Sequence, residues 1–514
     1  MNFWESVRRC TLLKFSWVFA LAYSTLNKDR RTLPALGMIL LFQILINYTL
    51  ATFEWHVINR FRKSDSGKGQ LPPQYPSLIP YLGNPFSFIW DNAKFIRHVT
   101  NVLAKDRVDH ITHQGFHRAL SGPGLIPTSR RYVSALTVRL DEKRFSTNWA
   151  EMEDFSNFFR DVVSSSLIEF LYGPTMIRLN PEFMKELWGF DASVPWLARG
   201  VPSFIKPSAY KPRENCVAQL KLWYSYARKH FTKSSISPDG DGDPYWGSNL
   251  MRYRQEKLLA VKNHDDDALA RMDLGLAWGS VGNTIPCAML SAFHIFKGPV
   301  LLQRVRDEVK VSLGDLKLLE IDLNKFTKNP LLSSIYAETL RLYIKTYFMV
   351  SSPHVDVNLG KWTLSKGRIG LMNADRFLTD PTDPESGPVT SLIRASPDWV
   401  EPRREAYEKA RQTNQPFFSL DGIEGAWFPY GGGYSTCPGR FLAKSVILTT
   451  CAILARDYDI EMLSGNIEMS TWRFGLGVRG LKHSLPFRIR KRSARIAAGI
   501  YTGTNISSVV LVLI

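Results

Sequence analysis

Residues 427–441 read WFPYGGGYSTCPGRF, and this stretch decides how the rest of the chain is interpreted. Its three consecutive glycines let the backbone adopt positive φ angles and approach a bound group closely. A cysteine follows, Cys437, and behind it come Pro438 and an amphipathic run that predicts a helix over 441–454. Cys437 is therefore expected at a helix N-terminus, where free N–H groups and the helix dipole favour an anion. A thiolate in that position is a metal ligand or a nucleophile.

The spacing within this loop is aromatic residue, glycine, cysteine and glycine, at Tyr430, Gly433, Cys437 and Gly439. It resembles the haem-thiolate loop of the cytochromes P-450, although that family usually has Phe in place of Tyr430 and often a basic residue in place of Ser435. The resemblance implies that Cys437 binds the iron of haem b and that Tyr430, Gly433 and Gly439 belong to the cofactor-binding loop. For a lone cysteine, the alternative is a buried side chain next to a turn.

The composition is that of a globular protein with an ample core, since 45% of the 514 residues are hydrophobic. The five cysteines are odd in number, scattered and without Cys-x-x-Cys spacing, which argues against a disulfide framework or a zinc site and suits a reducing compartment. The net charge of +18 favours anionic partners such as a membrane surface or an acidic protein. Nucleic acid is disfavoured as a partner because no recognisable nucleic-acid-binding module is present.

Residues 1–63 are predicted to anchor the chain in a lipid membrane. Within them, residues 33–53 supply roughly the 20 mostly apolar residues that a helical span needs, and a buried helix is the alternative reading. No small-residue cleavage site stands out, so a retained anchor is expected rather than a cleaved signal peptide. Residues 64–85 are rich in proline, which predicts an extended linker, and they resemble the hinge of membrane-bound cytochromes P-450.

Residues 268–296 have the pattern of one long helix, and its middle reads WGSVGNTIP at 278–286. Glycines and a proline weaken the hydrogen-bond ladder of a helix and kink it locally, so that Asn283 and Thr284 can direct polar groups into the opening. A kinked core helix is the alternative. The segment resembles the distal helix above the iron, where most cytochromes P-450 have an acid before the threonine. With Asn283 there instead, it is similar to the branch of sterol 7α- and 12α-hydroxylases, prostacyclin synthase and fungal terpenoid-tailoring enzymes.

Residues 331–344 are predicted to form a helix that carries Glu338 and Arg341 on one face, where the two can pair. Alone this Glu-x-x-Arg pattern is weak. Its position about a hundred residues before the cysteine loop matches the Glu-x-x-Arg helix of the family, which implies a buried network beneath the haem. A buried ion pair needs further partners, and Arg403 is the candidate third member, with Arg404 as the alternative.

Residues 86–490 are expected to form a single catalytic domain, mainly α with small β-sheets, as the resemblance implies. Two strands with a turn at 366–367 are predicted within 355–372, and a strand–turn pair over 472–489, which in the family lines the substrate pocket. Residues 491–514 form a tail of unknown role. Three histidines near residue 113 are interpreted as surface residues rather than metal ligands, because no carboxylate or cysteine completes a set: His110, His113 and His117.

The resemblance implies a monooxygenase that inserts one oxygen atom of O2 into a C–H bond, with electrons from an NADPH–cytochrome P-450 reductase. Asn283 can orient water but cannot deliver a proton as an acid does, and Thr284 can act through water. Arg440 and Lys444 would suit an acidic flavoprotein partner. Two alternatives stay open: a redox-neutral rearrangement of a peroxide, and a haem protein without enzymatic activity.

The expected substrate is a large apolar molecule such as a sterol, a triterpenoid or another terpenoid of specialised metabolism. The expected location is the endoplasmic reticulum membrane, with the catalytic domain facing the cytosol. Both expectations rest on the apolar N-terminal segment and on the branch of the family that the distal helix resembles.

Overall fold

A computed structural model describes residues 108–313 except 263, residues 326–373 except 353, 360 and 361, residues 418 and 420, residues 427–432, and residues 436–492 except 474. The predicted anchor, the hinge, Gly433, Arg403 and nearly all of the C-terminal tail lie outside these residues. The chain divides into two compact units, which are described separately. The smaller one comprises Met1–Leu103, Trp196–Ile205 and Met349–Met372, and the larger one comprises the remainder.

The larger unit is mainly helical, as predicted. Its principal helices are α5 Val108–Leu120, α6 Leu125–Glu142, α7 Phe155–Phe158, α8 Ser164–Tyr172, α9 Pro174–Leu179, α10 Phe183–Ala198 (which ends in the smaller unit), α11 Pro207–His230, α12 Asn249–Leu259, α13 Asp266–Val281, α14 Thr284–Lys297, α15 Pro299–Leu313, α17 Pro330–Tyr343 and α21 Arg440–Asp457. Among the described residues no single helix is long and apolar enough to cross a membrane, and only one helix pair, bent by 111°, passes by length and composition.

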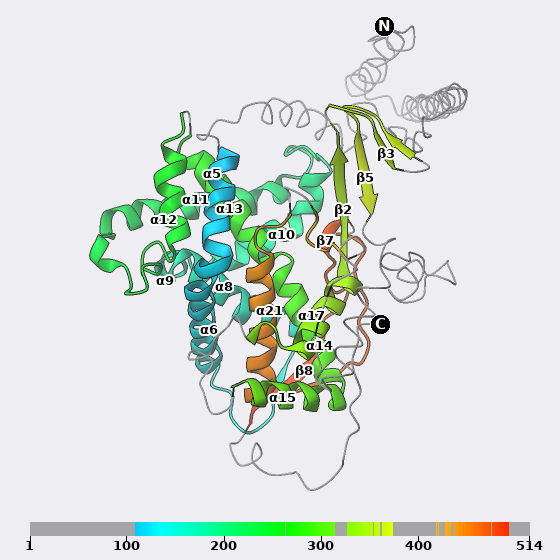
Figure 1. Cartoon of the computed structure of the whole chain (residues 1–514). Helices are drawn as coiled ribbons and strands as arrows, with labels where there is room; N and C mark the ends of the chain where they lie inside the picture. Colours follow the sequence, from blue (N-terminus) through cyan, green and yellow to red (C-terminus); the bar gives the residue numbers. More distant parts are fainter. Residues whose placement is uncertain are drawn as a thin grey trace, which may run out of the picture. The chain divides into compact units, whose positions relative to one another are not determined.

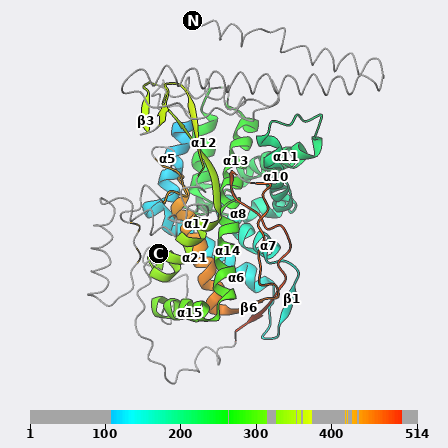
Figure 2. The same ribbon diagram turned by 90° about the vertical axis from the view of Figure 1, so that its right-hand side faces the viewer.

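Helices α14 and α21 form the centre of the larger unit. They pack against each other and run side by side in both views (Figures 1 and 2). Most residues of both helices are buried, which is typical of a helix that is covered by other elements on nearly every side. Helix α6 packs on α21 as well, and the Tyr132 hydroxyl lies 2.5 Å from the Thr450 hydroxyl, so the buried polar groups of this contact satisfy each other.

One antiparallel sheet has the order β1-β8-β6, with β1 Ala150–Met152, β8 Phe487–Lys491 and β6 Tyr458–Met462. The apolar spacing over 150–172 is near 3.6 residues and indicates a helix, but the first three residues of this range pair with β8 instead. The helix starts only after Asp154, whose carboxylate accepts the backbone N–H groups of Ser156 and Asn157. Strand pairing therefore overrides local periodicity up to this N-cap.

The predicted strand–turn pair over 472–489 is wrong, because its two strands belong to different sheets. Strand β7 Leu476–Val478 pairs with β2 Ile344–Ser351 and not with β8, because the chain between the two strands leaves one sheet and enters the other. Strand β2 begins in the larger unit and ends in the smaller one.

The smaller unit holds the hairpin of β3 Val357–Leu359 and β4 Trp362–Leu364, and then β5 Ile369–Asn373 beside β2. The predicted turn at 366–367 exists, with Gly367 at φ 70°. It leads into a third strand, whereas the sequence predicted two.

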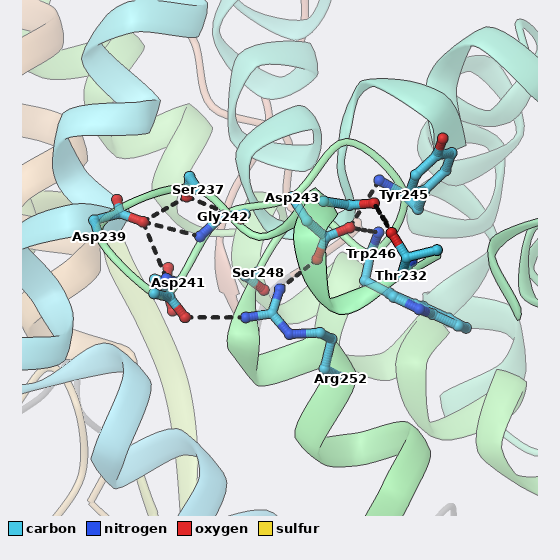
Figure 3. Close-up of polar contacts among 12 residues, drawn as sticks. Thr232, Ser237, Asp239, Asp241, Gly242, Asp243, Tyr245, Trp246, Ser248 and Arg252 are labelled. Atoms are coloured by element: carbon cyan, nitrogen blue, oxygen red, sulfur yellow. Dashed lines mark hydrogen bonds and ion pairs between the residues drawn. The ribbon is translucent and has the colours of Figure 1, made fainter. Parts of the chain in front are cut away.

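The polar loop between α11 and α12 is held by its own aspartates (Figure 3). Asp239 accepts the N–H groups of Asp241 and Gly242, and Asp243 accepts those of Tyr245 and Trp246. The guanidinium of Arg252 pairs with the second oxygen of Asp243, whose side chain is fully buried. The carboxylates are thus used by turns and by arginine, which explains this acidic cluster as a structural feature.

Candidate active site

Cys437 lies directly before the central helix α21. Its backbone N–H donates to the Tyr430 carbonyl at 3.0 Å, which closes the loop, and the amides of Gly439 and Arg440 donate to its sulfur. The helix begins at Arg440 with Gly439 as the N-cap, so Pro438 lies in the preceding turn and not in the first helical turn. A Cβ atom added at Gly439 would lie 3.8 Å from Sγ, so the N-cap passes close to the sulfur.

Cys437 differs from the other described cysteines in its exposure. Cys216, Cys287 and Cys451 are fully buried, and burial raises the pKa of each to about 12, which makes them unreactive thiols. Cys437 is only half-buried. Burial also raises its pKa, although the two amides and the charge of Arg440 act in the opposite direction. Burial therefore disfavours the thiolate, whereas the two amides and the charge of Arg440 favour it.

Two tyrosines fix the loop against helix α17. The Tyr336 hydroxyl donates to the Tyr430 hydroxyl at 2.8 Å, and the Trp427 indole N–H donates to the Ala337 carbonyl at 3.3 Å. Burial is the main reason why the pKa of Tyr430 is raised well above its usual value, so both phenols stay protonated at neutral pH. Tyr430, where the family usually has Phe, thus adds a polar link to α17.

Helix α17 carries the predicted Glu-x-x-Arg pair. Arg341 donates from Nε and Nη2 to the two carboxylate oxygens of Glu338, at 2.7 and 2.5 Å. Such a two-point contact fixes both side chains more firmly than a single ion pair. The arginine side chain is 11% exposed and the glutamate 36%. Arg403 and Arg404, the predicted third partners, lie outside the described residues.

The predicted long helix is broken at Gly282 and Asn283, where α13 ends and α14 begins. Pro286 explains the position of the break, because it has no N–H to give to the carbonyl of Gly282. Thr284 is the first residue of α14 and is buried, whereas Asn283 is exposed between buried neighbours. The sequence therefore predicted the interruption correctly.

An open face leads along α13 to this break. Gly275 and Gly279 are spaced by four residues, so they share one side of α13, and Asn283 follows at the break. All three are exposed, and an added Cβ at either glycine would meet no atom within 4 Å. Helix α13 thus has one side that the described residues leave uncovered.

The side chain of Asn283 makes a structural contact that the sequence did not reveal. Its Oδ1 accepts the backbone N–H of Val478 in strand β7 at 2.9 Å. Gly477 has φ 121°, and a Cβ there would lie 2.2 Å from the same oxygen. The hydrogen bond of Asn283 therefore holds strand β7 against the break between α13 and α14, in addition to any role of this side chain in orienting water.

A buried polar cluster beside the break was missed by the sequence analysis. Asp191 on α10 accepts the Trp278 indole N–H at 2.8 Å and the Arg473 Nη1 at 2.6 Å. A Cβ added at Gly282 would lie 3.5 Å from an oxygen of Asp191, which places the carboxylate next to the break. The three partners come from chain segments more than eighty residues apart, so no local pattern could have revealed them.

The two cations assigned to a reductase contact are partly engaged within the chain. Arg440 donates to the Cys437 carbonyl at 3.0 Å and lies 4.4 Å from the Phe441 ring. The Lys444 ammonium lies 5.3 Å from the centre of the Phe418 ring. Burial lowers the pKa of Lys444 to about 8.

Comparison with known proteins gives the family. The chain is 30% identical over 425 residues to the cytochrome P-450 monooxygenase fsoE of Humicola fuscoatra, which covers 75% of this chain and 71% of that protein. The chain belongs to the cytochrome P-450 family. The monooxygenase efuG of Hormonema carpetanum is 29% identical over 417 residues, covering 74% of this P-450 and 72% of the relative. No family model matches.

Two further comparisons agree. The 25-hydroxycholesterol 7-alpha-hydroxylase of Rattus norvegicus is 23% identical over 409 residues, covering 77% of this chain and 93% of the relative. The heme domain of cytochrome P-450DA has the same fold, with a TM-score of 0.54 at 12% identity, over 74% of this chain and 77% of that one. This P-450 is accordingly a monooxygenase, and family membership implies a haem-thiolate cofactor. The relatives' names favour monooxygenation over the peroxide rearrangement.

The residues around Cys437 fit such a cofactor. A half-buried sulfur that receives two backbone N–H donors suits an iron-bound thiolate, because these donors stabilise its negative charge. Among the described residues no group of three or more His, Cys, Asp and Glu side chains could hold a metal ion. A single cysteine ligand to a haem iron needs no such group.

Proposed function

We propose that this P-450 hydroxylates a large apolar terpenoid or sterol, with haem b held by Cys437. The observation that carries the proposal is the setting of Cys437, whose sulfur receives the amides of Gly439 and Arg440 at the start of α21. When bound, the haem supplies the chemistry that inserts one atom of O2 into a C–H bond and reduces the other to water.

The chain's own residues position the reactants and protons. Thr284 stands at the start of α14 beside the helix break, where its hydroxyl can pass a proton through water to the distal side. Asn283 holds β7 against this break and so fixes one wall of the distal site. The open face of α13 gives an apolar substrate a place to lie next to these groups. This arrangement supports oxidation of a bulky ligand.

On the opposite side, the pair of Glu338 and Arg341 stabilises helix α17, to which Trp427 and Tyr430 fix the cysteine loop. We assign Tyr430, Gly433 and Gly439 to the haem-binding loop and Arg403 to the network of Glu338 and Arg341. The contacts of Trp427 and Tyr430 with α17 hold the described part of this glycine-rich loop in one position.

The remaining parts of the proposal concern the environment of the enzyme. Residues 33–53 would anchor it in the endoplasmic reticulum membrane, residues 64–85 would be the hinge, and residues 86–490 the catalytic domain. Electrons would come from an NADPH–cytochrome P-450 reductase whose acidic surface meets the face near Arg440. The net charge of +18 supports an anionic partner and a membrane surface.

The test is a carbon-monoxide difference spectrum of the reduced full-length protein, followed by turnover of sterols and terpenoids with NADPH and reductase. The wild type should give the thiolate absorption band and NADPH-dependent hydroxylation. Cys437→Ala should lose the band and the activity, whereas Cys216→Ala, a substitution at a buried cysteine, should keep both if folded. Retention of haem and activity in Cys437→Ala would refute the proposal.

A further inference from the structure

Within the described part of the chain, only one of the three guanidinium nitrogens of Arg473 has a hydrogen-bond partner. Arg473 is 8% exposed, and its Nη1 donates to Asp191 at 2.6 Å. Its Nε and Nη2 are buried as well, and within the described part of the chain neither has a hydrogen-bond partner. Buried donors without an acceptor are unfavourable, so such a group requires an explanation.

The two unpaired nitrogens lie along one edge of the planar guanidinium. This edge presents two parallel N–H groups, and its spacing matches the two oxygens of a carboxylate. The pair of Arg341 and Glu338 in this protein shows the same arrangement, with Nε and Nη2 on the two oxygens of one carboxylate. The free edge of Arg473 therefore fits a carboxylate better than a single hydroxyl.

Among the described residues, the two carboxylates near Arg473 are already engaged. Both oxygens of Asp191 are used, one by Trp278 and one by Arg473 Nη1. Arg160 is a second guanidinium close to Asp191, and Asp154 is the other carboxylate that acts on it. Asp154 accepts three backbone amides, including that of Leu485, at the N-terminus of α7. The described carboxylates near Arg473 are thus occupied, which leaves its Nε and Nη2 available to a bound ligand.

The position of Arg473 next to the helix break links it to the distal site. Asp191, its partner, lies beside Gly282, which comes directly before the exposed Asn283 and follows the exposed Gly275 and Gly279 of α13. The Arg473 carbonyl accepts the N–H of Leu476 in a turn that leads into β7. This turn also contains Gly475 at φ 87°. A glycine-rich turn can adjust to a ligand more readily than a regular strand can.

We infer that Arg473 binds a carboxylate carried by the otherwise apolar substrate, and thereby orients that substrate along the open face of α13. The inference rests on the proposed function and gives it a substrate class, an apolar polycyclic or long-chain acid. Asp191 and Trp278 are positioning residues, because they hold the guanidinium with its free edge available. The oxidised carbon would lie at the other end of the molecule from the acid.

The test compares acids with their methyl esters on the full-length haem-loaded protein. Three matched pairs serve as probes: a pentacyclic triterpene acid, a sterol with a carboxylated side chain, and a long-chain fatty acid. Their affinities are measured from the shift of the haem absorption band. We expect at least one acid to bind about tenfold or more tightly than its ester, since the ester cannot receive a charge-assisted two-point contact.

The variants separate binding from folding. Arg473→Gln alone leaves Asp191 buried without its cation, so it is combined with Asp191→Asn. The double variant should keep its haem and lose the preference for the acid. Asp191→Asn alone should keep that preference, because Arg473 remains, whereas a purely structural role predicts the same loss in both variants.

The inference is overturned if every ester binds as well as its acid, if no acid shifts the spectrum, or if the double variant keeps the preference. It is also overturned if the double variant loses haem while the wild type is fully loaded, since Arg473 would then pair with a propionate of the cofactor. Wild-type protein without haem would instead refute the proposed function, and the inference with it.

Discussion

Asn283→Ala should separate the two roles that this residue can have. The side chain makes no cap hydrogen bond at the start of α14, so its loss does not remove a helix cap. It does remove the acceptor of the Val478 N–H, which belongs to a fully buried residue. A buried donor that loses its acceptor costs about 1–3 kcal/mol. We expect the variant to be destabilised by this amount.

Asn283→Asp is the matched control, since a carboxylate oxygen can accept the same N–H. It should retain most of the stability and, in addition, place an acid before Thr284. The assay is thermal unfolding at one scan rate with equal haem content, because unfolding of a cofactor protein of this size is not a simple two-state equilibrium. The stabilising role of the hydrogen bond between Asn283 and Val478 is refuted if Asn283→Ala is as stable as the wild type. It is also refuted if Asn283→Asp is destabilised as much as Asn283→Ala.

The same pair of variants reports on turnover. If β7 is a wall of the distal site, loosening it in Asn283→Ala should broaden the set of hydroxylated positions on one substrate. Asn283→Asp should keep the position and change the fraction of NADPH that ends in product, because an acid can deliver protons that an amide cannot. Product analysis by mass spectrometry, with NADPH consumption measured in parallel, distinguishes a positional effect from a proton-delivery effect. Identical product distributions in all three proteins would contradict the positional role.

Gly477→Ala should destabilise the protein by at least about 1–3 kcal/mol in thermal unfolding, because φ 121° is unfavourable for alanine and the new Cβ would lie 2.2 Å from Asn283 Oδ1; unchanged stability would contradict this contact. Arg341→Lys should lower stability by about 1–3 kcal/mol and release haem more easily, since lysine cannot make the two-point contact with Glu338. Stability should rise as pH increases from about 8 to 10.5, because burial lowers the pKa of Lys444 from 10.5 to about 8, a shift worth up to about 3 kcal/mol. Lys444→Met should be more stable at pH 7 and lose this rise; an equal pH profile would refute the assignment.

The sequence predicted those parts of the fold that depend on local signals. The sequence predicted α17, α21 and the long helix that contains α13 and α14, and Asp265 caps that helix by accepting the Ala268 N–H at 2.9 Å. The break near Asn283 followed from the glycines and Pro286. Strand pairing was wrong where partners are distant in sequence: β7 pairs with β2, about 130 positions earlier, and residues 150–152 pair with β8 instead of starting a helix. Propensity contains no information on such partners.

The candidate site also has parts that follow from local motifs and parts that depend on contacts between distant residues. Cys437, Glu338 and Arg341 were found because each lies in a short motif whose spacing has a physical reason. The extent to which burial opposes the thiolate of Cys437 could not be predicted, because it depends on the folded chain. Asn283 was assigned correctly to the helix break, but its partner Val478 lies 195 positions away.

Arg473 shows why substrate selection is the part of function least visible in a sequence. In the printed chain it is one of 65 basic residues, next to an exposed tryptophan and a glycine-rich turn, which suggests a surface arginine. Folding brings it to Asp191, 282 positions away, and excludes water from its free edge. A charge on the surface is solvated and selects little, whereas the same charge in a buried setting with one unpaired edge discriminates strongly between an acid and a neutral ligand. We therefore propose that the motifs of this P-450 determine how oxygen is used, and that the long-range contacts around the helix break select the molecule that receives it.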